Sequence, residues 1–205
     1  MAVMFFMIGF GAGLVIPFMN LYFATRFQCS SAQIGAFFAI AQSLTAAAAM
    51  VAPLLARWFG ALKTATIMQL LSLPFLVTLG FERHLNVAVA AFCIRATLMQ
   101  AASPLLQAFV MEVLPARLRA RAASVNNLVW NLGWATSATV SGWIIQEFGY
   151  ATPFYITAGL YGSASLYFYS VFRKRRPAED AKPPEPEALM PEEAKGLRGE
   201  GPFTE

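Results

Sequence analysis

Six long apolar segments constrain what this chain can fold into. They cover residues of about 2–24, 33–56, 63–81, 87–113, 121–145 and 152–172, and short polar or turn-rich stretches separate them. A helix needs roughly 20 mostly apolar residues to cross the hydrocarbon core of a bilayer, and each segment meets or approaches that length. Membrane barrels show instead segments of about ten residues with alternating apolarity. The sequence therefore predicts an all-α polytopic membrane protein with six transmembrane helices over residues 1–172.

The composition agrees with this prediction. Hydrophobic residues make up 58% of the chain and charged residues 13%, whereas soluble domains carry about 25% charged residues. The basic residues do not form one face, so we expect a lipid bilayer and no nucleic acid among the partners. Cys29 and Cys93 are too few for a disulfide framework and lack metal-ligand spacing. We expect no metal and no cofactor.

The charges between the segments predict an orientation. The turns on the side where the chain starts, together with the stretch after the last segment, carry nine basic residues: Arg57, Lys63, Arg117, Arg119, Arg121 and the RKRR run at 173–176. The other turns carry only Arg26 and Arg83. Cytoplasmic loops of membrane proteins are enriched in Lys and Arg. We therefore expect a multi-pass protein of the cell membrane with both termini in the cytoplasm.

The two ends of the chain differ in character. Residues 173–205 start with the basic run and continue rich in Pro, Glu, Ala and Gly, which predicts a basic anchor followed by a disordered cytoplasmic tail. Met1 opens directly into the first apolar segment without a charged flank. Either later loops set the topology or a preceding cytoplasmic segment is missing, and we favour the second.

Small residues and prolines recur inside the segments. Gly9, Gly13 and the run 46–49 predict close helix packing, because small side chains let backbones approach in lipid. Pro17, Pro53, Pro74 and Pro104 predict kinks, which membrane helices tolerate when neighbouring helices satisfy the freed carbonyls.

Several motifs resemble the major facilitator superfamily (MFS) of secondary transporters. GFGAGLVIPFMNLYF and SSAQIGAFFAIAQ resemble the first helix of a half-transporter and the start of the second. APLLARWFGALKT resembles the loop between the second and third helices, with Arg57, Gly60 and Lys63 matching and Ala56 in the acidic position. The stretch from IRATLMQAASPLLQ to ATPFYITAGLY resembles helices ten to twelve of a twelve-helix facilitator. The resemblance covers residues 1–172 and implies the C-terminal six-helix half.

The resemblance implies a function and a partner. A facilitator moves a small solute by alternating access, with one half rocking against the other around a central site. We therefore expect a second six-helix half, either a missing N-terminal half of a longer parent or a partner chain. Efflux and proton coupling stay open. The alternative is a non-transporting membrane scaffold or assembly subunit.

Polar residues within the spans are the candidate binding residues. Arg95 lies nine residues past Asn86, so it is roughly 13 Å deep at 1.5 Å per residue. It would meet an anionic or polar group of the solute, or tune a coupling carboxylate in the other half. The alternative is a structural arginine that snorkels or bonds helix carbonyls. Gln100 is a second candidate on the same segment.

The fifth segment carries another group of candidates. Asn127, Asn131 and Trp134 follow the spacing i, i+4 and i+7, so they share one helix face, and Trp130 lies beside it. Amide side chains beside an indole ring predict a site that hydrogen-bonds a polar solute and packs it against an aromatic wall. The alternative is an amide hydrogen bond between helices with packed tryptophans.

The remaining candidates concern a gate and an enzyme activity. By resemblance, Glu112 pairs with Arg57 beside Arg119 to close an inner gate, although positive-inside charge alone also explains the arginines. The only histidine, His84, lies in a loop, and no predicted span contains Asp. An intramembrane protease needs a Ser–His pair, two Asp residues or a metal. We predict that the protein is not an enzyme.

Overall fold

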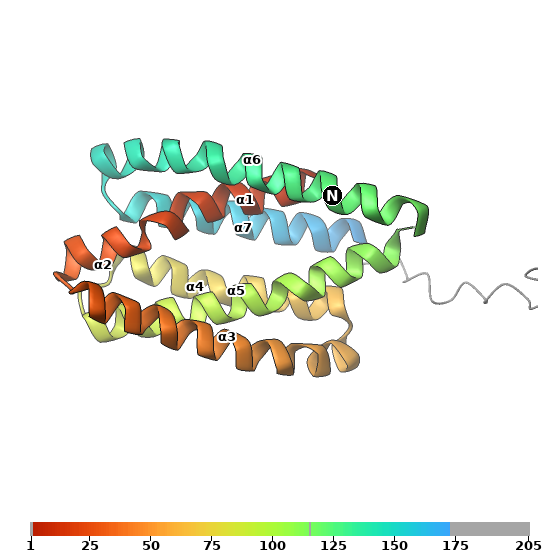
Figure 1. Cartoon of the computed structure of the whole chain (residues 1–205), viewed down its shortest axis with the longest axis horizontal. Coiled ribbons are helices and arrows are strands. Elements are labelled where there is room, and N and C mark those ends of the chain that lie inside the picture. The colour runs from red at the N-terminus through yellow and green to blue at the C-terminus, as the bar shows by residue number, and fades with distance from the viewer. Residues whose placement is uncertain (1, 115, 173–205) are drawn as a thin grey trace, which may run out of the picture.

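The computed structural model describes residues 2–114 and 116–172, and within them it is helical without strands. The helices are α1 (Ala2–Val15), the short 3-10 helix η1 (Ile16–Phe18), α2 (Met19–Phe27), α3 (Ser31–Phe59), α4 (Ala61–Phe81), α5 (Leu85–Val113), α6 (Ala116–Phe148) and α7 (Ala151–Phe172). They run side by side along the long axis of the molecule (Figure 1). Each of the six predicted segments is helical, so the predicted all-α class is confirmed. The predicted tail, 173–205, lies outside the described residues.

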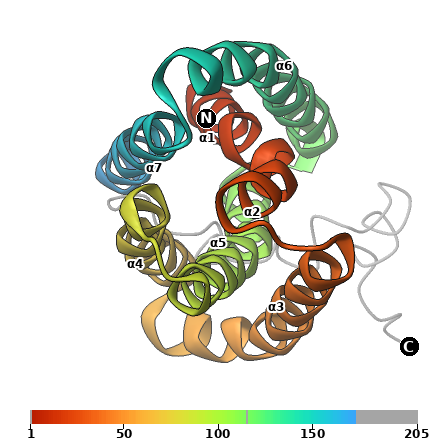
Figure 2. The same cartoon turned by 90° about the vertical axis from the view of Figure 1, so that its left-hand side faces the viewer.

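Viewed end-on, the helices follow one another around an arc in the order α6, α1, α7, α4, α5, α3 (Figure 2). Consecutive members of this arc pack against each other, and α1 packs most extensively against α6. As a result, α3 and α6 stand at the two ends of the arc, each with a long exposed side. Among the exposed large apolar residues on these two helices are Leu44, Met50, Leu54, Leu128 and Leu132.

Local sequence signals set the helix boundaries. Ser30 caps α3 in a capping box, in which its hydroxyl accepts the Gln33 N–H and the Gln33 side chain accepts the Ser30 N–H. Gly60 separates α3 from α4 with a φ of +83°, a backbone conformation that glycine adopts without a steric penalty.

The first predicted span is broken in the middle. Pro17 has no backbone N–H, and η1 replaces a turn of α-helix at Ile16–Phe18. Neighbouring helices donate to carbonyls on the N-terminal side of this break. The Ser141 hydroxyl of α6 donates to the Leu14 carbonyl at 2.5 Å, and the Thr157 hydroxyl of α7 donates to the Gly11 carbonyl at 3.1 Å. These bonds fix α1 between α6 and α7.

Glycines bring α1 and α6 to backbone contact. A Cβ on Gly133 of α6 would lie 2.8 Å from the Phe6 carbonyl oxygen. A Cβ on Gly9 or Gly13 of α1 would overlap the carbonyl oxygen of Trp130 or Trp134. The predicted packing role of Gly9 and Gly13 is therefore confirmed.

The other predicted packing run behaves differently. In the run 46–49 on α3, only Ala48 packs against the core, while the other three alanines are exposed. Within the described part of the chain only Ala48 supports the predicted close packing, and the packing of the other three alanines stays a prediction.

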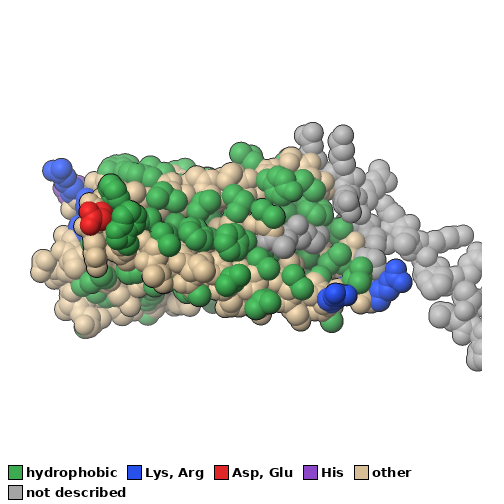
Figure 3. Space-filling view, turned by 90° about the horizontal axis from the view of Figure 1, so that it is seen from above, with side chains coloured by type: hydrophobic (Ala, Val, Ile, Leu, Met, Phe, Trp, Pro, Cys, Tyr) green, Lys and Arg blue, Asp and Glu red, His purple; other side chains and the backbone are tan. Residues whose placement is uncertain are grey.

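On the face shown in Figure 3, charged side chains lie at the two ends of the bundle, and apolar side chains are spread over the body between them. Four helical segments are long and apolar enough to cross a membrane: Val3–Phe27, Ser31–Phe59, Ala61–Phe81 and Leu85–Met111. α6 and α7 are long enough but not apolar enough to count among these segments, because they carry more Asn, Ser, Thr and Tyr. The predicted six spans are thus supported by length and composition in four cases.

The loop between α4 and α5 holds a hydrogen-bonded carboxylate at one end of the bundle. One oxygen of Glu82 accepts the backbone N–H groups of Arg83 and His84, at 2.9 and 2.8 Å. These two bonds favour the charged form and hold the pKa of Glu82 below its ordinary value of 4.5. The Arg26 side chain donates to the Glu82 carbonyl at 3.1 Å and ties α2 to the same loop.

The first prediction concerns the glycine contact. We expect Gly9→Ala to lower stability by about 1–3 kcal/mol, because the added Cβ forces α1 away from the Trp130 backbone. Gly159→Ala on α7 is the matched control, since a Cβ there meets nothing within 4 Å; it should be neutral or slightly stabilising. Thermal unfolding in lipid nanodiscs compares them, and equal midpoints would contradict the close contact.

The second prediction concerns pH. A carboxylate with a depressed folded pKa contributes stability above its ordinary pKa of 4.5 and loses it as pH falls through the lower folded pKa. We expect the unfolding midpoint of the wild type to fall faster than that of Glu82→Gln below about pH 5. Glu147→Gln, at an exposed position on α6, is the control and should follow the wild type. Parallel curves for all three proteins would refute this role of Glu82.

Candidate functional site

Two adjoining pockets lie along the face between α1, α3, α5 and α6. Their volumes are about 450 Å³ and 640 Å³, within the range of small-molecule sites. They share a common wall formed by Ile16, Met99, Gln100, Ser103, Gln107, Trp130 and Tyr161. We call the first the amide pocket and the second the arginine pocket, after the polar residues that distinguish them.

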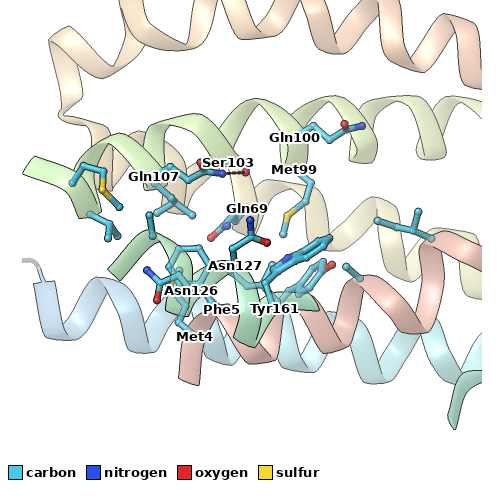
Figure 4. A pocket seen from close by; sticks show the side chains of 18 residues that line it. Met4, Phe5, Gln69, Met99, Gln100, Ser103, Gln107, Asn126, Asn127 and Tyr161 are labelled. Atoms are coloured by element: carbon cyan, nitrogen blue, oxygen red, sulfur yellow. Dashed lines mark hydrogen bonds between the residues drawn. The ribbon is translucent and has the colours of Figure 1, made fainter. Parts of the chain in front are cut away.

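The amide pocket collects carboxamide side chains from three helices (Figure 4). Gln69 comes from α4, Gln107 from α5, and Asn126 and Asn127 from α6. Gln69 is buried, and its side-chain oxygen accepts the hydroxyl of Ser165 at 2.8 Å. That bond orients the amide so that its NH₂ group is the donor left for the pocket. The pocket can therefore hydrogen-bond a neutral polar group.

The arginine pocket takes its name from Arg95 on α5. This residue is only 3% exposed, and its Cζ lies 6.0 Å from the ring centroid of Tyr161 on α7. Its Nε and Nη2 groups find no hydrogen-bond acceptor among the described residues. No Asp or Glu lines either pocket. The guanidinium is buried against Tyr161, and Arg95 lines a pocket whose lining contains no acidic residue.

Aromatic side chains form much of the wall around Arg95. The rings of Phe38 and Phe92 lie 5.0 Å apart, and those of Trp130 and Trp134 lie 5.1 Å apart. At the edge of the pocket, Gln100 of α5 donates to Gln42 of α3 at 3.2 Å. The arrangement combines one buried cation, an aromatic wall and a pair of amides.

The structure brings most of the predicted binding residues together. Arg95 and Trp134 line the arginine pocket, Asn127 lines the amide pocket, and Gln100 lines both. Asn131 lines neither pocket. Its side-chain NH₂ donates to the backbone carbonyl of Asn127 at 2.8 Å and also to the side-chain oxygen of Asn127. Asn131 therefore contacts Asn127, which lines the amide pocket, without lining the pocket itself.

Some lining residues were not singled out from the sequence. Gln69, Gln107 and Asn126 are polar residues in apolar segments, a signal that was present but shared by many others. Tyr161 gave no signal, because an aromatic residue in an apolar run is typical of any membrane helix.

The predicted gate residues lie at the end of the bundle opposite Glu82. Arg57 is exposed near the end of α3, and the Arg119 side chain donates to the Leu114 carbonyl at 3.1 Å. The side chain of Glu112 lies outside the described residues. The proposed pairing of Glu112 with Arg57 therefore stays a prediction. Among the described residues, no cluster of His, Cys, Asp and Glu could hold a metal ion.

The sequence profile of the Major Facilitator Superfamily matches residues 1–203. The chain belongs to this superfamily. The niacin transporter NiaP of Acinetobacter baylyi is 30% identical over 105 residues, which cover 51% of this chain and 19% of that protein. The chain is thus a multi-pass membrane protein of a transporter family, and it aligns with about a fifth of the length of this relative.

A third prediction follows from the two Arg95 donors, Nε and Nη2, that lack an acceptor among the described residues. Buried donors without acceptors cost about 1–3 kcal/mol each, so Arg95→Met should raise the unfolding temperature of the ligand-free protein by several degrees. Lys63→Met, at an exposed end position, is the control and should change little. A clear loss of stability in Arg95→Met would show that Arg95 serves the fold.

Proposed function

We propose that the chain is the C-terminal six-helix half of a secondary carrier that moves a small solute across the cell membrane by alternating access. The observation that carries this proposal is Arg95, a buried cation that lines a pocket on the face between the two ends of the helix arc and has two donors without an acceptor among the described residues. A non-transporting scaffold gains nothing from a cation that costs stability at that depth.

All six helical segments cross the bilayer in this proposal, with α1, η1 and α2 together forming the first of them. α6 and α7 lie alongside α1, the first of the apolar spans (Figure 1), and their hydroxyls face α1 carbonyls through Ser141 and Thr157. Polar groups satisfied in this way can enter a membrane. The charge imbalance between the two sides, with Arg57, Lys63 and Arg119 on the richer side, supports cytoplasmic termini.

A second six-helix half completes the carrier. Both pockets lie on the face between α3 and α6, the two helices with long exposed apolar sides. A second bundle on these helices would close the pockets and bury those sides, and rocking between the halves would expose the site alternately. Arg57, Glu112 and Arg119 would form the inner gate. No described pocket residue is acidic, so a proton carrier would belong to the other half.

Transport in proteoliposomes, with the chain assembled with its complementary half, is the test. Niacin, named for the related protein, is the first of a panel of solutes. We expect Arg95→Ala to reduce uptake about tenfold or more, because it removes a charged hydrogen-bonding group from the site. Asn131→Ala should act more weakly, through Asn127.

Asn86→Ala, at the exposed start of α5, serves as the control and should transport like the wild type. Wild-type rates in both site variants would overturn the site assignment. Failure of the assembled wild type to transport any solute of the panel would favour the scaffold.

A further inference from the structure

Two buried amides of the amide pocket keep hydrogen-bonding groups that the described residues do not use. Gln69 of α4 is 4% exposed and Asn126 of α6 is 7% exposed, and both are among the side chains that line the pocket (Figure 4). The Gln69 oxygen accepts the Ser165 hydroxyl, which leaves the Gln69 NH₂ group without an acceptor among the described residues. The amide of Asn126 has neither a donor nor an acceptor partner among them.

These groups remain accessible and are not sealed in the core. Among the described side chains that are not exposed, the polar atoms that are both fully enclosed and without a partner belong to Arg95 and Thr97. The Gln69 nitrogen and the Asn126 amide are therefore reached from the pocket that both residues line. A solute in the amide pocket can take these hydrogen bonds.

The free groups predict the polar edge of the solute. Together the two residues offer two NH₂ donors and one carbonyl acceptor. The complement is an imide edge, in which an N–H lies between two carbonyl oxygens. The N–H and one carbonyl of such an edge can pair with Asn126 through two parallel bonds, as Asn does with adjacent groups on a nucleic-acid base. The other carbonyl can accept the Gln69 NH₂ group.

The rest of the lining favours an uncharged and flat solute. No Lys, Arg, His, Asp or Glu lines the amide pocket, so a charged group would be buried there without a counter-ion. Most of the wall is apolar, with Met4, Phe5, Leu106 and Val110 among its members. Such a wall would leave many hydroxyls of a sugar without partners. A ring that carries its polar groups along one edge fits both the amides and the apolar wall.

We propose that the amide pocket binds small uncharged cyclic imides, such as a pyrimidinedione ring, with the imide edge held by Gln69 and Asn126. This inference deepens the proposed function and rests on it, because it names the class of solute that the carrier would hold in this pocket.

Equilibrium binding of radiolabelled uracil to the whole chain in lipid nanodiscs tests the proposal. Three competitors separate its parts: 1-methyluracil keeps the imide edge, 3-methyluracil replaces the central N–H by a methyl group, and orotate keeps the edge but adds a carboxylate. We expect 1-methyluracil to compete about as well as unlabelled uracil, and the other two about tenfold or more weakly. No saturable uracil binding would overturn the proposal without any variant. So would 3-methyluracil or orotate competing as well as 1-methyluracil.

Variants assign the binding to the buried amides. Asn126→Leu should weaken uracil binding about tenfold or more. It should keep the fold, because the replaced amide makes no hydrogen bond to the described residues. Asn86→Leu, at the exposed start of α5, is the matched control and should bind like the wild type. Unchanged binding in a folded Asn126→Leu protein would overturn the assignment.

The outcome is separable from that of the proposed function. Transport of other solutes by the assembled protein, with no uracil binding, would reject this class of solute and leave the carrier standing. Asn126-dependent uracil binding with no transport of any solute, uracil included, would keep the site and reject the carrier.

Discussion

The backbone contact between α1 and α6 is the interaction on which the arrangement of the site depends. Gly9 and Gly13 of α1 and Gly133 of α6 have no side chain. The backbone of each helix, including its carbonyl groups, therefore lies against the glycine Cα atoms of the other. This fixes the rotation of α6, and with it the side of α6 that presents Trp130 and Trp134 to the arginine pocket. In lipid, where apolar burial drives little association, such fitted surfaces and hydroxyl–carbonyl bonds supply the specificity of packing.

Arg95 differs from most buried polar side chains of the bundle in its hydrogen bonding. Most buried polar groups of the bundle are satisfied within it, such as Ser141 on Leu14 and Ser165 on Gln69. Arg95 has two buried donors without an acceptor among the described residues, which costs stability. The rest of the bundle stabilises the position of this side chain through Tyr161 and the helices around it.

The sequence was sufficient to locate the six helical segments, because long apolar runs alternate with short polar turns. It also singled out Arg95, since a charge inside an apolar run is a local signal. It could not place Asn131, because the register of α6 is set by Gly133 and α1, a contact between residues far apart in the chain. For the same reason it gave no sign that Tyr161 of α7 lies against Arg95 of α5.

α1 is synthesised long before α6, and this order suits the uneven polarity of the two helices. α1 belongs to a strongly apolar span, whereas α6 carries Asn126, Ser137 and Ser141 toward its neighbours. When α6 leaves the ribosome, the α1 surface with Gly9, Gly13 and the Leu14 carbonyl acceptor has already been made. The more polar helix therefore follows its most extensive packing partner, α1, along the chain, and its buried polar groups have that partner available as soon as it is made.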